Sequence, residues 1–142
     1  MVILTQTDTT VGFVSQNAKR LYEIKSRKGS KSFIVVYEDF RFFLASGNRV
    51  PHAKKNLVRR SRQTSFIVKN RAFRVAKSHL DSQVLRDMKW SYSTSANQSG
   101  KRFDRSFCEG KADIVIEDKK ELYENSSSTL LKINNIKTVQ IR

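Results

Sequence analysis

The chain has 142 residues, and its 28 Lys and Arg residues outnumber its 13 Asp and Glu residues, which gives a formal net charge of +15. This length fits a single domain over residues 1–142 with a modest core, and no apolar run approaches the roughly 20 residues that a membrane-spanning helix needs. The single cysteine, Cys108, excludes an internal disulfide and favours a reducing compartment such as the cytoplasm.

The first part of the chain is predicted to form a strand at residues 2–5, a helix at residues 15–25 and a buried strand at residues 32–37. The first strand is not expected to be a secretory signal, because it is too short and no basic residues precede it. Between the first two elements, a Thr and Asp cluster followed by Gly12 indicates an ordinary strand-to-helix turn. Ser15 is the expected N-cap of the helix, and Gly29 is its expected stop signal.

The middle and end of the chain continue this alternation of strands and helices. We expect a short helix at residues 38–44, a hairpin at residues 63–69 and 72–75, a helix at residues 81–88, a strand at residues 88–92, a helix at residues 101–109, and strands at residues 112–117, 126–133 and 138–142. The basic residues 56–62 show no clear pattern. The alternation indicates an α/β fold.

The positive charge is concentrated between residues 40 and 80, where there are eleven Lys or Arg and no Asp or Glu. Such a surface attracts polyanions such as nucleotides, pyrophosphate or RNA. Ordinary solvated lysines are the alternative interpretation. The two His, Cys108 and the scattered acids lack the spacing of a zinc site, so we predict no metal-binding residues.

A segment of small polar residues follows the strand predicted at residues 88–92. Residues 93–100 are Ser-Thr-Ser-Ala-Asn-Gln-Ser-Gly. Small side chains let a ligand approach the backbone, and Gly100 permits angles that other residues avoid. Ser and Asn both donate and accept hydrogen bonds, which suits phosphate oxygens or a nucleotide-bound metal. From composition alone, a polar surface turn is the commoner interpretation.

The order of residues 93–100 resembles the Ser-Thr-Ser-Ala-Asn-x-Ser-Gly signature of the YrdC-like family, the threonylcarbamoyl-AMP synthases. Residues 7–13 resemble the family's Pro-Thr-(Asp/Glu)-Thr-x-Tyr-Gly-Leu motif, with Gln6 in place of the proline and Val11 in place of the tyrosine. Lys25 and Arg27 match a Lys-x-Arg motif at the end of the same helix.

Further matches follow in the same order along the chain. Arg74 matches the arginine of a Thr-x-x-x-Arg-Val motif, with Asn70 in place of the threonine. Ser128 falls in a segment that resembles the family's Ser-Thr-(Ile/Val) strand. Arg142 falls in one that resembles the strand carrying its late arginine. Without the family, Ser128 is a serine at a strand start and Arg142 a frayed terminal charge.

The resemblance implies a twisted, mostly mixed sheet with flanking helices and a positively charged concave face. The implied activity is synthesis of L-threonylcarbamoyl-AMP from threonine, bicarbonate and ATP with release of pyrophosphate, for the threonylcarbamoyl modification of adenosine in tRNA. The carbamate formed from threonine would attack the α-phosphorus of ATP, with Mg²⁺ present. The product would pass to a downstream tRNA-modifying transferase complex.

The resemblance also implies roles for individual residues. Lys25 and Arg27 are the expected catalytic residues and would hold the phosphates. Because an exposed charge contributes little to stability, replacing Lys25 is expected to change folding very little. The other expected contacts are Arg27, Lys31, Ser95, Asn97 and Arg142 with ATP, and Thr7, Thr9, Arg74 and Ser128 with threonine, whose carboxylate would bind Arg74.

Two alternatives stay open at this point. A non-catalytic protein that binds tRNA or double-stranded RNA fits the charge of +15 and the departures at Gln6, Val11 and Asn70. A related carbamoyl-adenylate enzyme with another substrate fits the missing tyrosine at Val11. Pyrophosphate release in the presence of ATP, threonine and bicarbonate distinguishes the implied activity from both alternatives.

Overall fold

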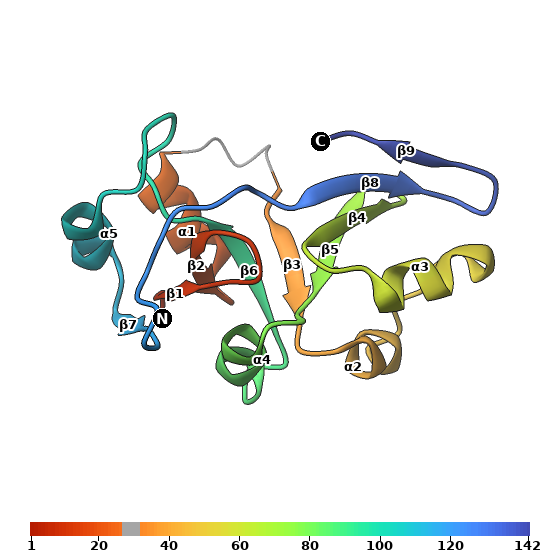
Figure 1. Ribbon diagram of the computed structural model, residues 1–142, viewed down its shortest axis with the longest axis horizontal. Coiled ribbons are helices and arrows are strands. Elements are labelled where there is room, and N and C mark those ends of the chain that lie inside the picture. The colour runs from red at the N-terminus through yellow and green to blue at the C-terminus, as the bar shows by residue number, and fades with distance from the viewer. Residues whose placement is uncertain (27–31) are drawn as a thin grey trace.

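The computed structural model describes residues 1–26 and 32–142. In these residues one nine-stranded sheet is flanked by helices (Figure 1). The strands are β1 (Ile3–Gln6), β2 (Val11–Ser15), β3 (Ile34–Tyr37), β4 (Thr64–Val68), β5 (Arg71–Val75), β6 (Trp90–Ser95), β7 (Ile114–Ile116), β8 (Thr129–Ile133) and β9 (Thr138–Gln140). The helices are α1 (Ala18–Lys25), α2 (Phe40–Ala45), α3 (Lys55–Arg60), α4 (His79–Leu85), α5 (Arg105–Lys111) and the 3₁₀ helix η1 (His52–Lys54).

The sheet is mixed, as the sequence predicts, and its strand order is β7-β1-β2-β6-β3-β5-β4-β8-β9. The pairs β1–β7, β3–β5 and β4–β8 are parallel, and the remaining pairs are antiparallel. Parallel pairs need long crossover connections, which here contain helices. The predicted α/β class and the twisted mixed sheet are therefore confirmed.

Side chains on the two faces of the sheet form separate cores, because neighbouring residues of a strand point to opposite faces. On one face, Phe13 of β2 packs with Leu21 of α1 and Cys108 of α5, and Phe73 of β5 packs with Phe43 of α2. The opposite face is covered by α4, whose Leu85 packs in a smaller cluster. This second face therefore leaves more of the sheet uncovered.

Residues 7–15 depart from the prediction. β2 pairs antiparallel with β1, so the segment before it is a hairpin turn and not a strand-to-helix turn. The helix begins at Ala18 after the N-cap Asn17, whose side chain accepts a hydrogen bond from the Arg20 amide. Ser15 ends the strand instead, and its hydroxyl donates to the Met1 carbonyl at 2.6 Å. The short apolar run of β2 was hidden because it directly precedes helix-favouring residues.

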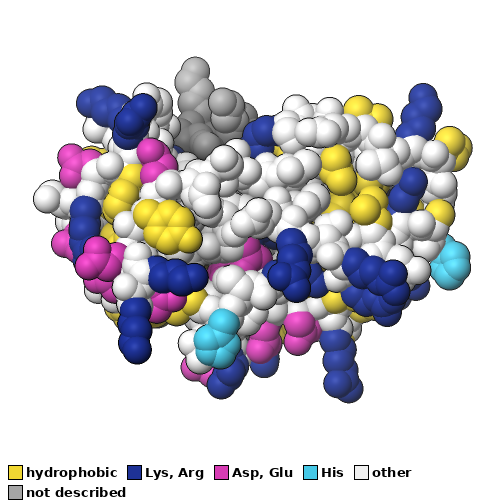
Figure 2. Space-filling model, viewed as in Figure 1, with side chains coloured by type: hydrophobic (Ala, Val, Ile, Leu, Met, Phe, Trp, Pro, Cys, Tyr) yellow, Lys and Arg dark blue, Asp and Glu magenta, His cyan; other side chains and the backbone are white. Residues whose placement is uncertain are grey.

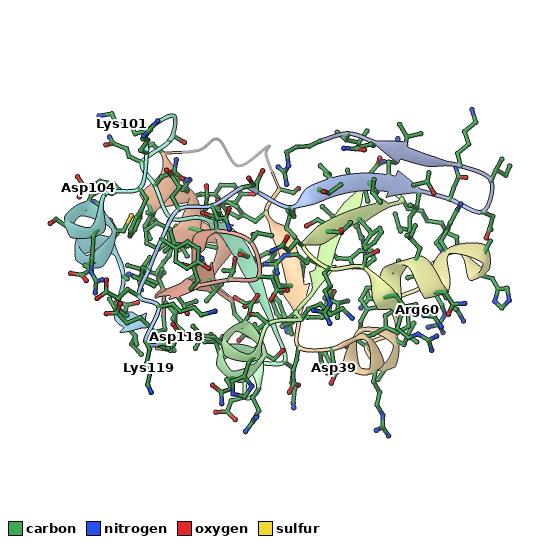
Figure 3. The ribbon with its side chains drawn as sticks, in the orientation of Figure 1. Asp39, Arg60, Lys101, Asp104, Asp118 and Lys119 are labelled. Carbon is green, nitrogen blue, oxygen red and sulfur yellow. The ribbon has the colours of Figure 1, made fainter. Side chains whose placement is uncertain are left out.

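The basic region forms one end of the molecule. Residues without a clear predicted pattern form α3, in which Val58 is buried and the neighbouring Arg59 and Arg60 are exposed. Figure 3 places Arg60 on α3, far from Asp104 and Asp118 near α5 and β7. In Figure 2 many of the acidic side chains lie at the end that carries α5 and β7. Charge is therefore unevenly distributed along the sheet.

Candidate active site

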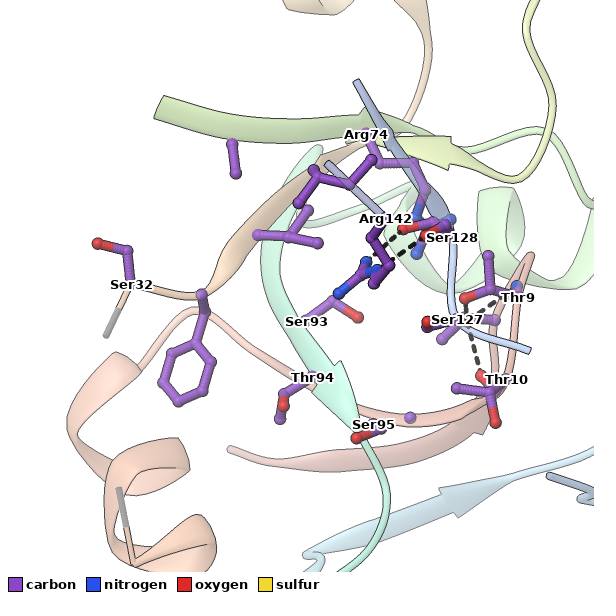
Figure 4. A pocket seen from close by; sticks show the side chains of 16 residues that line it. Thr9, Thr10, Ser32, Arg74, Ser93, Thr94, Ser95, Ser127, Ser128 and Arg142 are labelled. Atoms are coloured by element: carbon purple, nitrogen blue, oxygen red, sulfur yellow. Dashed lines mark hydrogen bonds between the residues drawn. The ribbon is translucent and has the colours of Figure 1, made fainter. Parts of the chain in front are cut away.

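A cavity of about 300 Å³ opens on the face of the sheet that carries α4 (Figure 4). Six residues that the sequence predicts as site residues line it: Thr7, Thr9, Arg74, Ser95, Ser128 and Arg142. An adjoining cavity of about 460 Å³ shares Thr10, Ser95 and Ser127 with the first and is lined also by Asn97. Segments that are far apart in the sequence therefore meet at one polar hollow.

The turn between β1 and β2 supplies one wall of the first cavity. The hydroxyl of Thr7 donates to the Thr10 carbonyl at 2.7 Å and lies 3.3 Å from the hydroxyl of Thr9. Gly12 follows, and a Cβ atom there would lie 3.0 Å from both the Thr7 methyl group and the Thr94 carbonyl oxygen. The close approach of the turn to β6 therefore requires glycine at this position.

Arg74 of β5 lies behind this wall in a buried cluster of charges. Its Nη1 atom is 2.9 Å from Asp8 Oδ2 and 3.2 Å from Asp81 Oδ2, and all three side chains are at most 4% exposed. Burial raises the pKa of the Asp81 carboxyl, while the Arg74 guanidinium opposes this rise and Asp8 adds to it. Oδ1 of Asp81 has no hydrogen-bond partner among the described residues.

Lys25 is buried, which corrects the expectation that it is a surface charge. It is 3% exposed. Its ammonium group donates to the Ser95 carbonyl at 2.9 Å, the Asn97 carbonyl at 2.8 Å and the Asn97 side-chain oxygen at 2.7 Å. Lys25 therefore holds the segment that follows β6 in place.

The segment that resembles the family signature is half strand and half turn. Ser93 and Ser95 belong to β6, because they pair with Ile34 of β3 and Gly12 of β2, so the turn starts at Ala96 and not at Ser93. Ser95 and Asn97 do meet, as their spacing suggests: the Ser95 hydroxyl donates to the Asn97 side-chain oxygen at 2.7 Å. Lys25 contacts both residues.

Ser128 and Arg142 close the far side of the first cavity. The guanidinium of Arg142 donates from Nε to the Ser128 carbonyl at 3.0 Å and from Nη2 to the Ser128 hydroxyl at 3.1 Å (Figure 4). The Ser128 hydroxyl in turn shares a 2.7 Å hydrogen bond with the Ser65 hydroxyl. Ser128 and Arg142 therefore lie against each other at this side of the cavity.

Some expectations have other outcomes. Arg27 and Lys31 lie outside the described residues. Asp8 matched the family motif but had no predicted role, and Asp81 was predicted only as a helix residue. Arg74 could have indicated that such carboxylates exist, since an arginine in an apolar strand needs a partner. Within residues 1–26 and 32–142, no group of three His, Cys, Asp or Glu could hold a metal ion, and no helix is long and apolar enough to cross a membrane.

No protein-family model and no curated protein matches the chain. Among solved structures, P. abyssi Sua5 complexed with L-threonine matches with a TM-score of 0.79 and 17% identity over 99% of this chain and 49% of Sua5. The MTH1692 protein from Methanobacterium thermoautotrophicum matches with a TM-score of 0.69 and 17% identity over 99% of this chain and 79% of MTH1692. Full-length HypF in a phosphate- and nucleotide-bound form matches with a TM-score of 0.76 and 12% identity over 99% of this chain and 22% of HypF. The chain thus spans about half the length of Sua5.

Proposed function

We propose that this chain, which has the YrdC-like fold of Sua5 and MTH1692, synthesises L-threonylcarbamoyl-AMP from threonine, bicarbonate and ATP for the modification of adenosine in tRNA. One observation carries the proposal: six separately predicted residues line a single cavity. The structure of Sua5 complexed with L-threonine supports an amino acid as the ligand of such a fold. The nucleotide-bound form of HypF supports a nucleotide.

The two adjoining cavities suggest two subsites. We assign threonine to the wall formed by Thr7, Thr9 and Ser128, with Arg74 behind it. We assign the phosphates of ATP to the side where Ser95 lines both cavities and Asn97 lines the second, near Lys25. The remaining assigned ATP contacts are Arg142, which lines the first cavity, and Arg27 and Lys31, which are assigned from the sequence alone.

The chemistry proposed for this site needs no protein nucleophile. The amine of threonine captures carbon dioxide, and an oxygen of the resulting carbamate attacks the α-phosphorus while pyrophosphate leaves. The chain would contribute by holding the reactants in line and by hydrogen bonds to the developing charge. Mg²⁺ binds triphosphates largely through phosphate oxygens and water, so it would enter with ATP, on the side that carries the oxygens of Ser95 and Asn97.

The proposed function is tested by measuring pyrophosphate release from ATP. We expect release that requires threonine and bicarbonate together. Release that continues when both are omitted, or no release at high enzyme concentration with all three substrates, contradicts it. Replacing threonine by other amino acids in the same assay tests the related-enzyme alternative, since a second substrate would give faster release than threonine.

Asn97→Asp tests the nucleotide subsite. The new carboxylate would lie beside the ammonium of Lys25, whose Nζ is now 2.7 Å from the Asn97 side-chain oxygen, and it would repel a triphosphate. It would also remove the amide group that now donates to the Lys101 carbonyl at 2.6 Å. We expect the dissociation constant of ATP to rise by at least about tenfold, while the thermal midpoint without ligand stays close to that of the wild type. Calorimetric titration with ATP measures this, and unchanged affinity would reduce the segment to a surface turn.

RNA binding is a second candidate function, favoured by a groove on the opposite face of the sheet. This groove of about 870 Å³ is lined by Val35 and Tyr92, whose strand neighbours Ile34 and Ser93 line the first cavity. No Asp or Glu of the described residues lines it. Its basic lining residues are Arg49, His52, Lys69 and Arg71.

If this groove binds RNA through its charges, tRNA affinity should fall steeply with salt. The logarithm of the association constant should decrease by roughly 0.7–0.9 for each unit of log salt and each neutralised phosphate. Fluorescence anisotropy with labelled tRNA measures the slope. Arg49→Glu/Arg71→Glu should flatten it, whereas Lys19→Glu, an exposed change on α1, should leave it nearly unchanged. Tight binding that does not depend on salt would contradict this candidate.

A further inference from the structure

The turn between β1 and β2 has two sides. Thr7 and Thr9 line the first cavity, whereas Asp8 between them does not. Instead, the Asp8 carboxylate accepts hydrogen bonds from the amide of Lys77 at 2.8 Å and the amide of Ser78 at 2.6 Å. Ser78 is the N-cap of α4. Asp8 thus fastens the turn to the start of this helix.

The same carboxylate also fastens the turn to β5. Asp8 Oδ2 is 2.9 Å from Arg74 Nη1, and the Asp8 amide donates to Asp81 Oδ2 at 3.2 Å. Asp81 lies in the first turn of α4 and is itself 3.2 Å from Arg74 Nη1. Three separate segments therefore meet at one buried point directly behind the wall that carries the two threonine hydroxyls.

The charges of this cluster indicate what it can do. Two carboxylates share Nη1 of one guanidinium, so the turn, β5 and α4 are joined through the Arg74 side chain. Burying charges in this way costs free energy, which their mutual contacts must offset. Holding the turn is the function that its contacts support. Support of the cavity wall is thus added to the carboxylate-binding role expected for Arg74, which itself lines the first cavity.

We propose that Asp8, with Arg74 and Asp81, is a positioning residue that fixes the turn so that Thr7 and Thr9 present their hydroxyls to an amino-acid substrate. The proposal rests on the proposed function, because it takes the first cavity as an amino-acid subsite. It adds a residue that acts on the substrate only through its neighbours.

The test is the affinity of Asp8→Asn for L-threonine, measured by calorimetry with a non-hydrolysable ATP analogue present. The amide group would turn a hydrogen-bond donor toward the Lys77 or Ser78 amide, so one fastening contact is lost. Arg74 and Asp81 remain as a neutral pair, which favours folding. We expect the threonine dissociation constant to rise by at least about tenfold and that of the ATP analogue to change less than about twofold. The control is Asp113→Asn, which breaks an exposed ion pair with Arg20, and it should change neither constant.

The sign of the effect separates positioning from electrostatics. If Asp8 acts only through its negative charge, its removal should strengthen the binding of a carboxylate, so tighter threonine binding overturns the proposal. Coupling with the wall gives a second readout. In a Thr9→Ala background, Asp8→Asn should weaken threonine binding by less than it does in the wild type, because both changes damage one wall. Strictly additive losses overturn the proposal.

The remaining outcomes are also decisive. Absence of threonine binding to the wild-type protein would overturn the proposed function and this inference together, whereas threonine binding that Asp8→Asn leaves unchanged overturns the inference alone. If Asp8→Asn does not fold, Asp81→Asn takes its place. That variant keeps both amide contacts of Asp8, so it should weaken threonine binding in the same direction but less, and unchanged or tighter binding overturns the proposal.

Discussion

Replacing Arg74 with methionine is expected to lower the free energy of unfolding by about 3–5 kcal/mol, the cost of breaking a buried ion pair from one side. The change would leave the carboxylates of Asp8 and Asp81, which are 3% and 1% exposed, without their cation. Urea denaturation at neutral pH measures the loss. The matched control is Arg20→Met, which breaks an exposed pair with Asp113 and should cost far less, because solvent screens such a pair.

The pH dependence of this loss has a definite sign. Without the guanidinium, burial raises the pKa of the Asp81 carboxyl further than in the wild type, where Arg74 opposes the rise. A carboxyl whose pKa is raised by folding destabilises the protein above its unfolded pKa and ceases to do so when it is protonated. The deficit of Arg74→Met should therefore shrink as the pH falls toward the ordinary range of aspartate. A loss equal to that of Arg20→Met at every pH would contradict the buried cluster.

Replacing Lys25 with methionine is expected to affect both turnover and folding. If the ammonium also contacts the phosphates in the reaction, pyrophosphate release should fall by about 10²–10³-fold, or roughly 2–4 kcal/mol, the scale for one preorganised donor. The part-buried hydrogen bonds from the Lys25 ammonium to the Ser95 and Asn97 oxygens would be lost, which should cost about 1–3 kcal/mol of stability, the range for hydrogen bonds that involve a charged group. The sequence alone predicted almost no change in folding, because it placed Lys25 on the surface.

Lys19→Met is the matched control for this prediction. Lys19 lies on the same helix but is exposed, so its replacement should leave both the rate and the urea midpoint nearly unchanged. The two readouts are independent. A Lys25→Met protein with a wild-type rate would remove Lys25 from the catalytic site, and one with wild-type stability would contradict its role in holding Ser95 and Asn97.

The residues that line the first cavity were located from the sequence where they lie in short recognisable motifs. Ser95 ends a strand that is recognisable from its apolar-aromatic start, and Asn97 follows it. Arg74 lies in an apolar strand segment whose burial follows from its neighbours. β2 was not predicted because its five residues directly precede the predicted helix and were assigned to the turn and the helix start. Its strand character comes from pairing with β1 and β6, which local propensity does not encode.

Contacts between side chains of different elements could not be predicted from local sequence patterns. Asp81 joins Arg74 only because α4 begins directly behind β5, and Asp8 reaches the same point from a turn near the start of the chain. The burial of Lys25 has the same origin, since its partners are 70 and 72 residues away. Such contacts depend on strand order, and neither spacing nor composition specifies it.

The proposed function requires that carbon from bicarbonate become part of an adenylate made in this cavity. The most direct measurement is mass spectrometry of the nucleotide product after incubation with ATP, threonine and ¹³C-labelled bicarbonate. We expect a threonylcarbamoyl adenylate that carries one labelled carbon and that is not formed when bicarbonate is removed. An unlabelled adenylate of threonine, formed equally well without bicarbonate, would contradict it.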